Sequence, residues 1–256
     1  MSEVEVIVDG PVSVVRMALP AKRNALVAQM REALIAALEA QMASAACRAI
    51  VLTGVETSFC AGGDLDSLRD HEPLEVRARM QRGQHLVRLI AAGRKPVIAA
   101  VNGAAHGAGL SLAAACDVVI AGDSARFGAV FMKVGLMADL GLLWSLPNRI
   151  GMSGTKRMLY GGLVVDADEA YRMGLADERA TDAGLLDAAL AYARTLAEAA
   201  PVALAMTKQA LARPCGSLEE ALALELDGQT LLFSTDDHVE GRDAFKERRT
   251  ARFKGR

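Results

Sequence analysis

Hydrophobic and polar residues alternate along two short stretches near the N-terminus, at residues 3–10 and 12–19. An Asp-Gly-Pro sequence lies where they meet, and a turn of this kind between two alternating stretches predicts a β-hairpin. Further along, residues 25–43 and 73–92 carry hydrophobic side chains at the three- and four-residue spacing of amphipathic helices. The chain therefore begins with paired strands and continues with helices that bury one face.

Three continuous hydrophobic runs predict buried strands, at residues 48–54, 95–103 and 118–123. Small residues at 107–117, opened by glycines, predict a helix before the last of these strands. Strands and helices alternate in this way up to about residue 130, which is typical of an α/β fold.

Beyond about residue 140 the pattern is mostly helical. Helices are predicted at residues 166–174, 181–200, 217–234 and 236–253. We expect an α/β core over residues 1–200 and a C-terminal helical region over residues 201–256.

Composition excludes several classes of protein. The 256 residues are 52% hydrophobic and 23% charged with a net charge of -2, so no basic surplus indicates nucleic acid or an anionic membrane. No uncharged hydrophobic run is long enough to span a bilayer, and no signal peptide is recognisable. The cysteines are scattered, which predicts reduced thiols in a cytoplasmic protein and no metal site: Cys47, Cys60, Cys116 and Cys215.

Two clusters of small residues follow predicted strands, FCAGGDL at 59–65 and NGAAHGAGLSL at 102–112. Turns that follow strands of an α/β sheet tend to share one side of it, where ligands bind. Two such turns can aim backbone N–H groups at one oxygen atom, which makes an oxyanion hole. The second cluster lacks the third glycine of a dinucleotide fingerprint and the last glycine of a serine-hydrolase elbow.

These clusters, together with several other segments in the same order, closely resemble the enoyl-CoA hydratase/isomerase (crotonase) superfamily. The other segments are KRNAL at 22–26, KPVIAAV and its continuation to ARFG at 95–128, VGLMADLG at 134–141, LPNRIG at 146–151 and EGRDAFKERRTARF at 240–253. The resemblance implies a spiral of ββα units, an acyl-CoA thioester substrate and a C-terminal helical trimerisation region. It also implies a homotrimer, or a hexamer built from two trimers.

Carried over position by position, the resemblance assigns the two oxyanion donors to the backbones of Gly63 and Ala108. It implies residues that bind the substrate through its coenzyme A: Lys22, Arg23, Ala61, Asp64 and Leu65. Phe253 and Lys254 resemble residues that reach coenzyme A across a subunit boundary.

The two glutamates of the family's hydratases are absent here. Ser111 stands at the first position, three residues after Ala108, and Phe131 at the second, four residues after Phe127. We expect both to line the acyl pocket. Asp139 matches the aspartate that some family isomerases carry, although Ala138 replaces the proline of their pattern. Hydrophobic neighbours are expected to desolvate it and raise its pKa: Leu136, Met137, Leu140, Leu142 and Leu143.

A lone carboxylate suits isomerisation, because one group can take a proton from one carbon and return it to another. The favoured interpretation is therefore an enoyl-CoA isomerase with Asp139 as its acid and base. Two alternatives stay open: hydration or thioester hydrolysis by water that Asp139 activates, and a non-catalytic acyl-CoA binding protein. Neither a metal nor a redox cofactor is expected, because proton transfer needs neither. Coenzyme A enters as part of the substrate. His106 is interpreted as structural.

Overall fold

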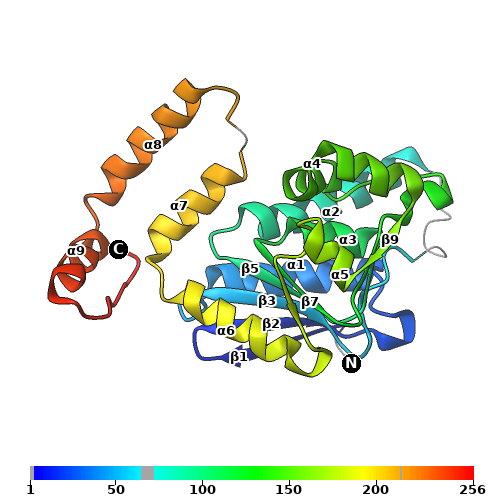
Figure 1. The fold of residues 1–256 in the computed structure, drawn as a ribbon, viewed down its shortest axis with the longest axis horizontal. Coiled ribbons are helices and arrows are strands. Elements are labelled where there is room, and N and C mark those ends of the chain that lie inside the picture. Colours follow the sequence, from blue (N-terminus) through cyan, green and yellow to red (C-terminus); the bar gives the residue numbers. More distant parts are fainter. Residues whose placement is uncertain (1–2, 65–71, 214) are drawn as a thin grey trace.

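Two β-sheets form the centre of the molecule, in a computed structural model that describes residues 3–64, 72–213 and 215–256 (Figure 1). The strands of the larger sheet, in spatial order, are β1 (Val4–Asp9), β2 (Val12–Met17), β3 (Ala49–Gly54), β5 (Val97–Val101), β7 (Val118–Gly122) and β10 (Glu178–Ala180). The first two pair in antiparallel fashion and the other neighbours are parallel. The predicted hairpin and the α/β class are thus confirmed.

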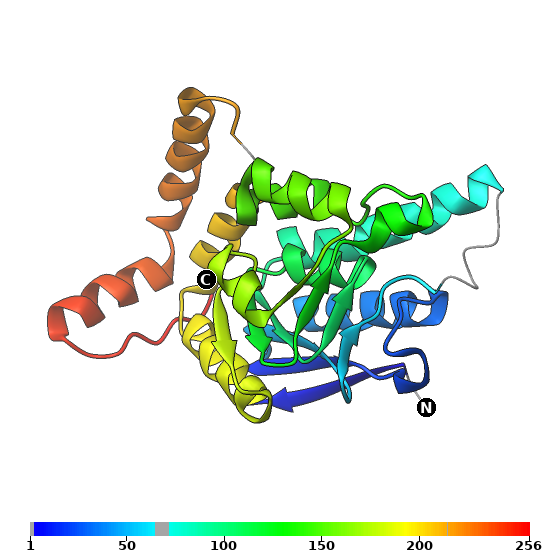
Figure 2. The ribbon, with the colours of Figure 1, turned by 45° about the vertical axis from the view of Figure 1, so that its right-hand side comes forward.

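Helices cover both faces of the larger sheet (Figures 1 and 2). Along β5, Ile98 and Ala100 pack in one cluster with α6 (Leu185–Ala197). The alternate residues, such as Ala99, belong to the main core on the other face, with side chains of α1 (Ala28–Ala43). A strand buried on both faces appears in the sequence as an unbroken hydrophobic run, which is the pattern that predicted β5.

A smaller sheet carries the turns of interest. Its strands, in spatial order, are β4 (Ser58–Cys60), β6 (Ala104–His106), β8 (Arg126–Gly128) and β9 (Val164–Asp166), and only β9 runs antiparallel to its neighbour. Sequence patterns did not predict this sheet, because each strand has three residues and lies among small residues typical of turns.

The remaining helices of the core are α2 (Pro73–Ala92), α3 (Ala108–Ala115), α4 (Leu142–Gly161) and α5 (Ala167–Arg172). The expected span of α2 is confirmed. The helix predicted from residue 25 begins only at Ala28, because the preceding segment is bound to the first glycine-rich turn: Leu26 N–H donates to Gly62 O at 2.8 Å, and Ala61 N–H donates to Arg23 O at 3.0 Å. These tertiary contacts override local helix propensity.

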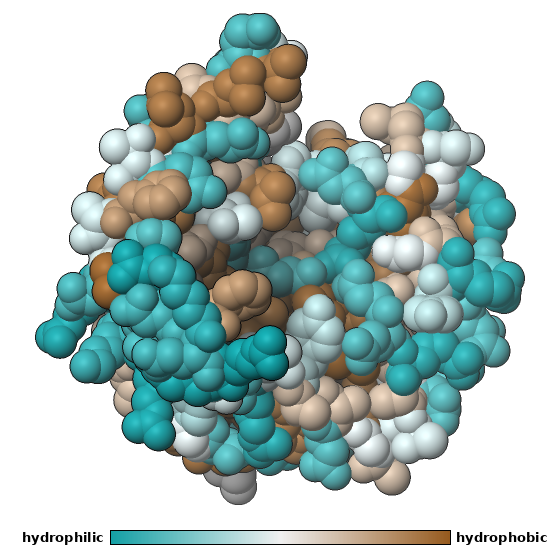
Figure 3. Space-filling model, turned by 60° about the vertical axis from the view of Figure 1, so that its left-hand side comes forward, coloured by the Kyte–Doolittle hydropathy of each residue, from teal (hydrophilic) through white to brown (hydrophobic). Residues whose placement is uncertain are grey.

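The C-terminal helices are α7 (Pro201–Leu211), α8 (Leu218–Leu232) and α9 (Asp236–Glu247), and α8 and α9 stand away from both sheets in both ribbon views (Figures 1 and 2). No described residue of α8 is buried. Its Leu226 is 68% exposed, and Phe233 just beyond it is 66% exposed. Figure 3 views the molecule from a side turned toward these helices and shows hydrophobic patches on this face. The division of the chain at residue 200 stays a prediction.

A buried lysine attaches α7 to the core. Lys208 is 8% exposed, and its Nζ donates to Ile90 O at 2.7 Å, to Lys95 O at 2.8 Å and to Asp117 Oδ2 at 2.6 Å. The same Asp117 oxygen accepts the N–H of Val97 at 2.7 Å. All three donor protons of the ammonium group are therefore satisfied, which is what makes its burial tolerable.

We expect Lys208→Met to lower the free energy of unfolding by about 3 kcal/mol, the low end of the range for one partner of a buried ion pair, because Asp117 keeps some contact with water. Urea denaturation measures this loss. Lys156→Met, at an exposed position of α4, is the control and should change stability by less than about 0.5 kcal/mol. Equal stability of the two variants would contradict the role given to Lys208.

None of the described helices combines the length and the hydrophobicity that crossing a bilayer requires.

Candidate active site

Three parallel strands of the smaller sheet end side by side and lead into the segments predicted to form the active site. β4 leads to Gly63, β6 leads to Ala108, and β8 leads to Phe131. Because neighbouring parallel strands present their carboxyl ends at one edge of a sheet, segments far apart in the sequence meet there. The sequence did not predict the smaller sheet, yet this sheet positions the site residues that the sequence did predict.

The two glycine-rich turns are in direct contact. Gly62 has a φ of +103°, and a Cβ on it would lie 2.8 Å from His106 O and 3.7 Å from Ala108 N. Only glycine fits this conformation at this distance. Gly107, at φ +51°, turns the chain into α3, so that Ala108 is the first residue of the helix. Its N–H has no intrahelical partner, as is general for the first turn of a helix.

Most of the predicted site residues line one cavity of about 710 Å³. They are Lys22, Arg23, Ala61, Gly63, Asp64, Ala108, Phe131 and Asp139. A cavity of this size accepts a ligand of the dimensions of a drug or a cofactor fragment. Leu65 lies outside the described residues.

Asp139 is partly buried in the wall of this cavity, and its Oδ1 is buried without a hydrogen-bond partner among the described residues. Burial raises the pKa of this carboxyl group, while its own backbone amide and the charge of Arg79 act in the opposite direction. The hydrophobic neighbours contribute unequally. Leu140 and Leu142 are buried, whereas three others predicted to desolvate Asp139 are exposed: Leu136, Met137 and Leu143.

Ser111 lies behind the cavity wall and not on it. It is fully buried, and its Oγ lies 3.1 Å from Asp139 O and 3.3 Å from Gly107 O, both of which can accept its proton. The serine therefore connects the second glycine-rich turn to the backbone of the candidate acid. These contacts join the two backbone segments, which a pocket-lining interpretation did not anticipate.

Positive charge surrounds the cavity. Lys22, Arg23 and Lys133 are exposed, and Lys22 Nζ forms an ion pair with Asp64 Oδ2 at 2.6 Å. Arg31 and Arg79 line the cavity from partly buried positions on α1 and α2. Sequence reasoning missed both of these arginines and Lys133. The sequence did carry a sign of Arg79, because this arginine interrupts a stripe of uncharged residues on one face of α2. The uncharged residues that line the cavity are Val76, Met80 and Gly83.

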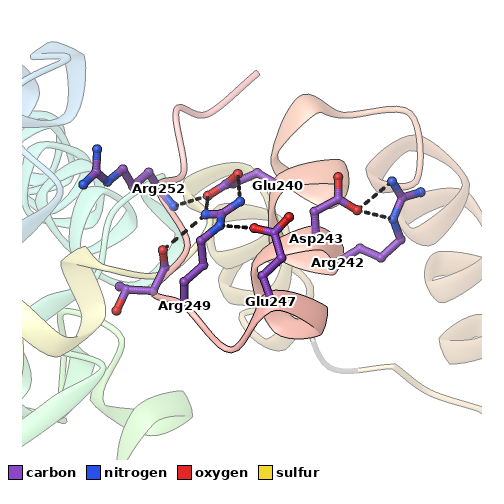
Figure 4. A network of polar contacts seen from close by, with 7 residues as sticks. Glu240, Arg242, Asp243, Glu247, Arg249 and Arg252 are labelled. Carbon is purple, nitrogen blue, oxygen red and sulfur yellow. Dashed lines mark hydrogen bonds and ion pairs between the residues drawn. The ribbon is translucent and has the colours of Figure 1, made fainter.

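Phe253 and Lys254 lie elsewhere within the single chain. The ring of Phe253 packs against Gly241 of α9, and Lys254 N–H donates to Asp237 Oδ1 at 2.6 Å. Lys254 borders a second, more polar cavity beside α9. Beside it, Arg249 binds Glu240 through two hydrogen bonds of 2.6 and 2.9 Å in the polar network of Figure 4. That network fixes the C-terminal segment against α9.

His106 does not line the cavity that contains Asp139. Its ring lies over Gly128, where a Cβ would come within 2.5 Å of His106 Cδ2. Burial lowers the pKa of His106, and the nearby positive charges of Arg23 and Lys133 act in the same direction. Neutral packing against the smaller sheet agrees with the structural interpretation.

Comparison with known proteins gives the family. The family model for enoyl-CoA hydratase/isomerase matches residues 8–256. The chain belongs to the enoyl-CoA hydratase/isomerase family. A probable enoyl-CoA hydratase of Rhodobacter capsulatus is 41% identical over 246 residues, which cover 95% of each chain. A 1,2-epoxyphenylacetyl-CoA isomerase of Escherichia coli is 37% identical over 215 residues, which cover 82% of each chain.

The fold agrees with this membership. The crystal structure of an enoyl-CoA hydratase from Bacillus anthracis matches with a TM-score of 0.93 at 29% identity, covering 99% of this chain and 100% of the other. The chain therefore has the crotonase-like fold, and an acyl-CoA thioester as substrate is consistent with its family. The names of similar enoyl-CoA hydratase/isomerase relatives say hydratase more often than isomerase.

Proposed function

We propose that this enzyme shifts a double bond within an enoyl-CoA thioester, with Asp139 as the acid and base. The observation that carries the proposal is the state of this carboxyl group: it lines the cavity, its Oδ1 has no protein partner within the described chain, and burial raises its pKa. Among the described residues that line the cavity, the other carboxylate, Asp64, is paired with Lys22. A base poised in this way is what proton transfer from carbon requires.

The proposed reaction begins with a β,γ-enoyl-CoA whose thioester oxygen accepts the N–H groups of Gly63 and Ala108. Asp139 removes a proton from the α-carbon, and the electron pair moves into the thioester carbonyl to give a dienolate. The two backbone donors stabilise the negative oxygen. The protonated Asp139 then delivers the proton to the γ-carbon, which leaves an α,β-enoyl-CoA and the original carboxylate.

Two other reactions on the same scaffold remain alternatives. The names of relatives support hydration, and water activated by Asp139 would also serve thioester hydrolysis. Hydration needs a group to activate water and a group to protonate the α-carbon. Ser111 and Phe131 supply no carboxylate at the two positions where the family resemblance expects one. A non-catalytic acyl-CoA binding protein is the third possibility.

Product analysis in heavy-oxygen water separates these possibilities. We expect β,γ-enoyl-CoA to yield α,β-enoyl-CoA with no heavy oxygen, as followed by mass spectrometry. A labelled 3-hydroxyacyl-CoA as the main product would establish hydration, and a labelled free acid would establish hydrolysis. Binding of the thioester without any product would support the binding protein.

The coenzyme A part of the substrate is proposed to bind at Lys22, Arg23, Ala61 and Asp64, whose side chains or backbone border the cavity. Proton transfer alone needs no further cofactor. We also propose a homotrimer or hexamer, in which a second copy covers the exposed hydrophobic side chains of α8 and brings Phe253 and Lys254 toward a neighbouring cavity. The exposure of Leu226 and Phe233 supports this assembly.

A further inference from the structure

The peptide unit between Gly62 and Gly63 carries one of the two proposed oxyanion donors, and its own residues leave its orientation open. Glycine adopts φ values of either sign, so two glycines in a row let the peptide unit between them rotate at little cost. Gly62 itself has a φ of +103°. If the unit rotated, the carbonyl oxygen of Gly62 would replace the N–H of Gly63 and repel a thioester oxygen. An oxyanion hole at this place therefore needs contacts from outside the two glycines.

A hydrogen bond from Leu26 fixes this peptide unit. The N–H of Leu26 donates to Gly62 O at 2.8 Å. In a planar trans peptide the C=O and the next N–H point in opposite directions, so this bond directs the N–H of Gly63 away from Leu26. Both glycines line the cavity, and no backbone carbonyl in the described parts of the chain accepts the Gly63 N–H. This donor is available to a ligand in the cavity.

A second hydrogen bond joins the same two segments. The N–H of Ala61 donates to Arg23 O at 3.0 Å. Residues 23–26 thus contact the first glycine-rich turn twice, once before Gly62 and once at its carbonyl group. Two bonds on successive residues fix the turn in direction as well as in place.

Asn24 holds residues 23–26 in position. It is 0% exposed, its Nδ2 donates to Val55 O at 3.1 Å and to Ser58 O at 2.7 Å, and its Oδ1 accepts the N–H of Leu19 at 2.9 Å. Val55 follows β3 and Ser58 begins β4, the strand that leads into the turn. The φ of Asn24 is +56°, a conformation that asparagine adopts more readily than most residues. The turn and the segment that binds it therefore share one support.

We propose that Leu26 positions the oxyanion hole, because its N–H holds the Gly62 carbonyl group and so aims the N–H of Gly63 at the thioester oxygen. Asn24 acts one step further away, by holding the segment that carries Leu26. The peptide unit then needs no rotation when negative charge develops on the oxygen. This inference rests on the proposed function, since it takes Gly63 as a donor to the thioester, but it does not depend on the role of Asp139.

The test exchanges single backbone N–H groups for ester oxygens, by incorporating the hydroxy acid that corresponds to each residue. The exchange at Leu26 keeps the side chain and removes the donor to Gly62 O. The exchange at Gly63 removes the proposed oxyanion donor itself and serves as the reference.

The matched control is the same exchange at Leu218, the first residue of α8, which is 67% exposed and whose N–H has no intrahelical partner. An ester also weakens the preceding carbonyl group as an acceptor. That effect is common to both leucines, because the carbonyl oxygens of Ala25 and Ser217 each accept one backbone N–H. Only the exchange at Leu26 removes a donor to the turn.

Difference infrared spectroscopy of bound butanoyl-CoA, isotopically labelled at the thioester carbonyl carbon, measures hydrogen bonding to the thioester oxygen without turnover. Donors to this oxygen lower the carbonyl stretching frequency. We expect the exchanges at Leu26 and at Gly63 each to lose about half of the shift, since two donors share the oxygen. The exchange at Leu26 should also lower kcat about tenfold to a hundredfold, as misplaced groups do. The exchange at Leu218 should leave both quantities unchanged.

The outcomes separate this inference from the proposed function. A full shift after the exchange at Leu26, beside a reduced shift after the exchange at Gly63, would overturn the inference and leave the proposed function intact. A full shift after the exchange at Gly63 would overturn both the donor assigned to that residue and the inference. A loss as large at Leu218 as at Leu26 would also overturn the inference.

Asn24→Asp tests the support. A carboxyl group has the same shape but cannot donate to both Val55 O and Ser58 O, so we expect a smaller infrared shift and a kcat lowered by about tenfold. Asn148→Asp, at an exposed position of α4, is the control and should change neither. An unchanged shift in folded Asn24→Asp would overturn the role given to Asn24. Because the ester exchanges keep every side chain, they decide the role of Leu26 even where Asn24→Asp does not fold.

Discussion

Replacing Asp139 by asparagine is expected to lower kcat for double-bond migration by about a hundred- to ten-thousandfold, the usual contribution of a positioned acid or base. The amide has the shape of the carboxylate but cannot accept and return the proton. Affinity for a saturated acyl-CoA should change little, because Asp139 acts on the α-carbon and not on coenzyme A. Steady-state kinetics and calorimetry together measure the two effects.

The pH dependence of activity and of stability gives a second test of the role of Asp139. Burial raises the pKa of Asp139 above its ordinary value of 3.8, so activity of the unsubstituted enzyme should fall as the pH drops through that raised pKa. The folded state then holds the proton more tightly than the unfolded state, so this group lowers stability as the pH rises from 3.8 through the folded pKa. Asp139→Asn removes that penalty and should be slightly more stable near neutral pH.

A control distinguishes chemistry from general damage. Asp187→Asn alters an exposed aspartate on α6, remote from the cavity lining, and should retain full turnover. If Asp139→Asn turned over as fast as Asp187→Asn, Asp139 would have no part in the proton transfer. The isomerase proposal would then fail together with its mechanism.

Much of the larger sheet could be predicted because its signals are local. The alternation at residues 3–10 and 12–19 gave the hairpin of β1 and β2, and the spacing at residues 73–92 gave α2. Buried parallel strands such as β5 appear as short unbroken hydrophobic runs. The sequence also indicated the first glycine-rich turn, but the close approach of Gly62 to His106 O, which leaves no room for a side chain, appears only in the structure.

What the sequence could not show depends on contacts between distant segments. The smaller sheet consists of strands of three residues that come from distant segments of the chain. The helix α1 begins later than predicted, because the segment before it is hydrogen-bonded to the chain at Gly62. Ser111 was interpreted as lining the pocket, but its hydroxyl group lies against the carbonyl oxygens of Gly107 and Asp139. No single-sequence pattern specifies a partner 28 residues away.

Replacing Ala108 by proline is expected to lower kcat by about a hundred- to a thousandfold, the usual cost of one oxyanion-hole donor. Proline replaces the backbone N–H by a ring methylene, which cannot donate a hydrogen bond to the thioester oxygen. The position tolerates it, because Ala108 is the first residue of α3, where proline is favoured and no intrahelical bond is lost. Gly107, at φ 51° and ψ −114°, lies in the mirror-image extended region that glycine can adopt before proline.

The matched control is Ala108→Gly, which keeps the N–H and should retain turnover within about threefold, because catalysis here depends on the backbone donor and not on the methyl group. Thermal unfolding should show that Ala108→Pro is folded before its kinetics are compared. A folded proline variant as active as the glycine variant would show that the amide of residue 108 does not hold the thioester oxygen. Because Gly63 supplies the other donor, residual activity above the uncatalysed rate is expected in the proline variant and does not contradict the oxyanion hole.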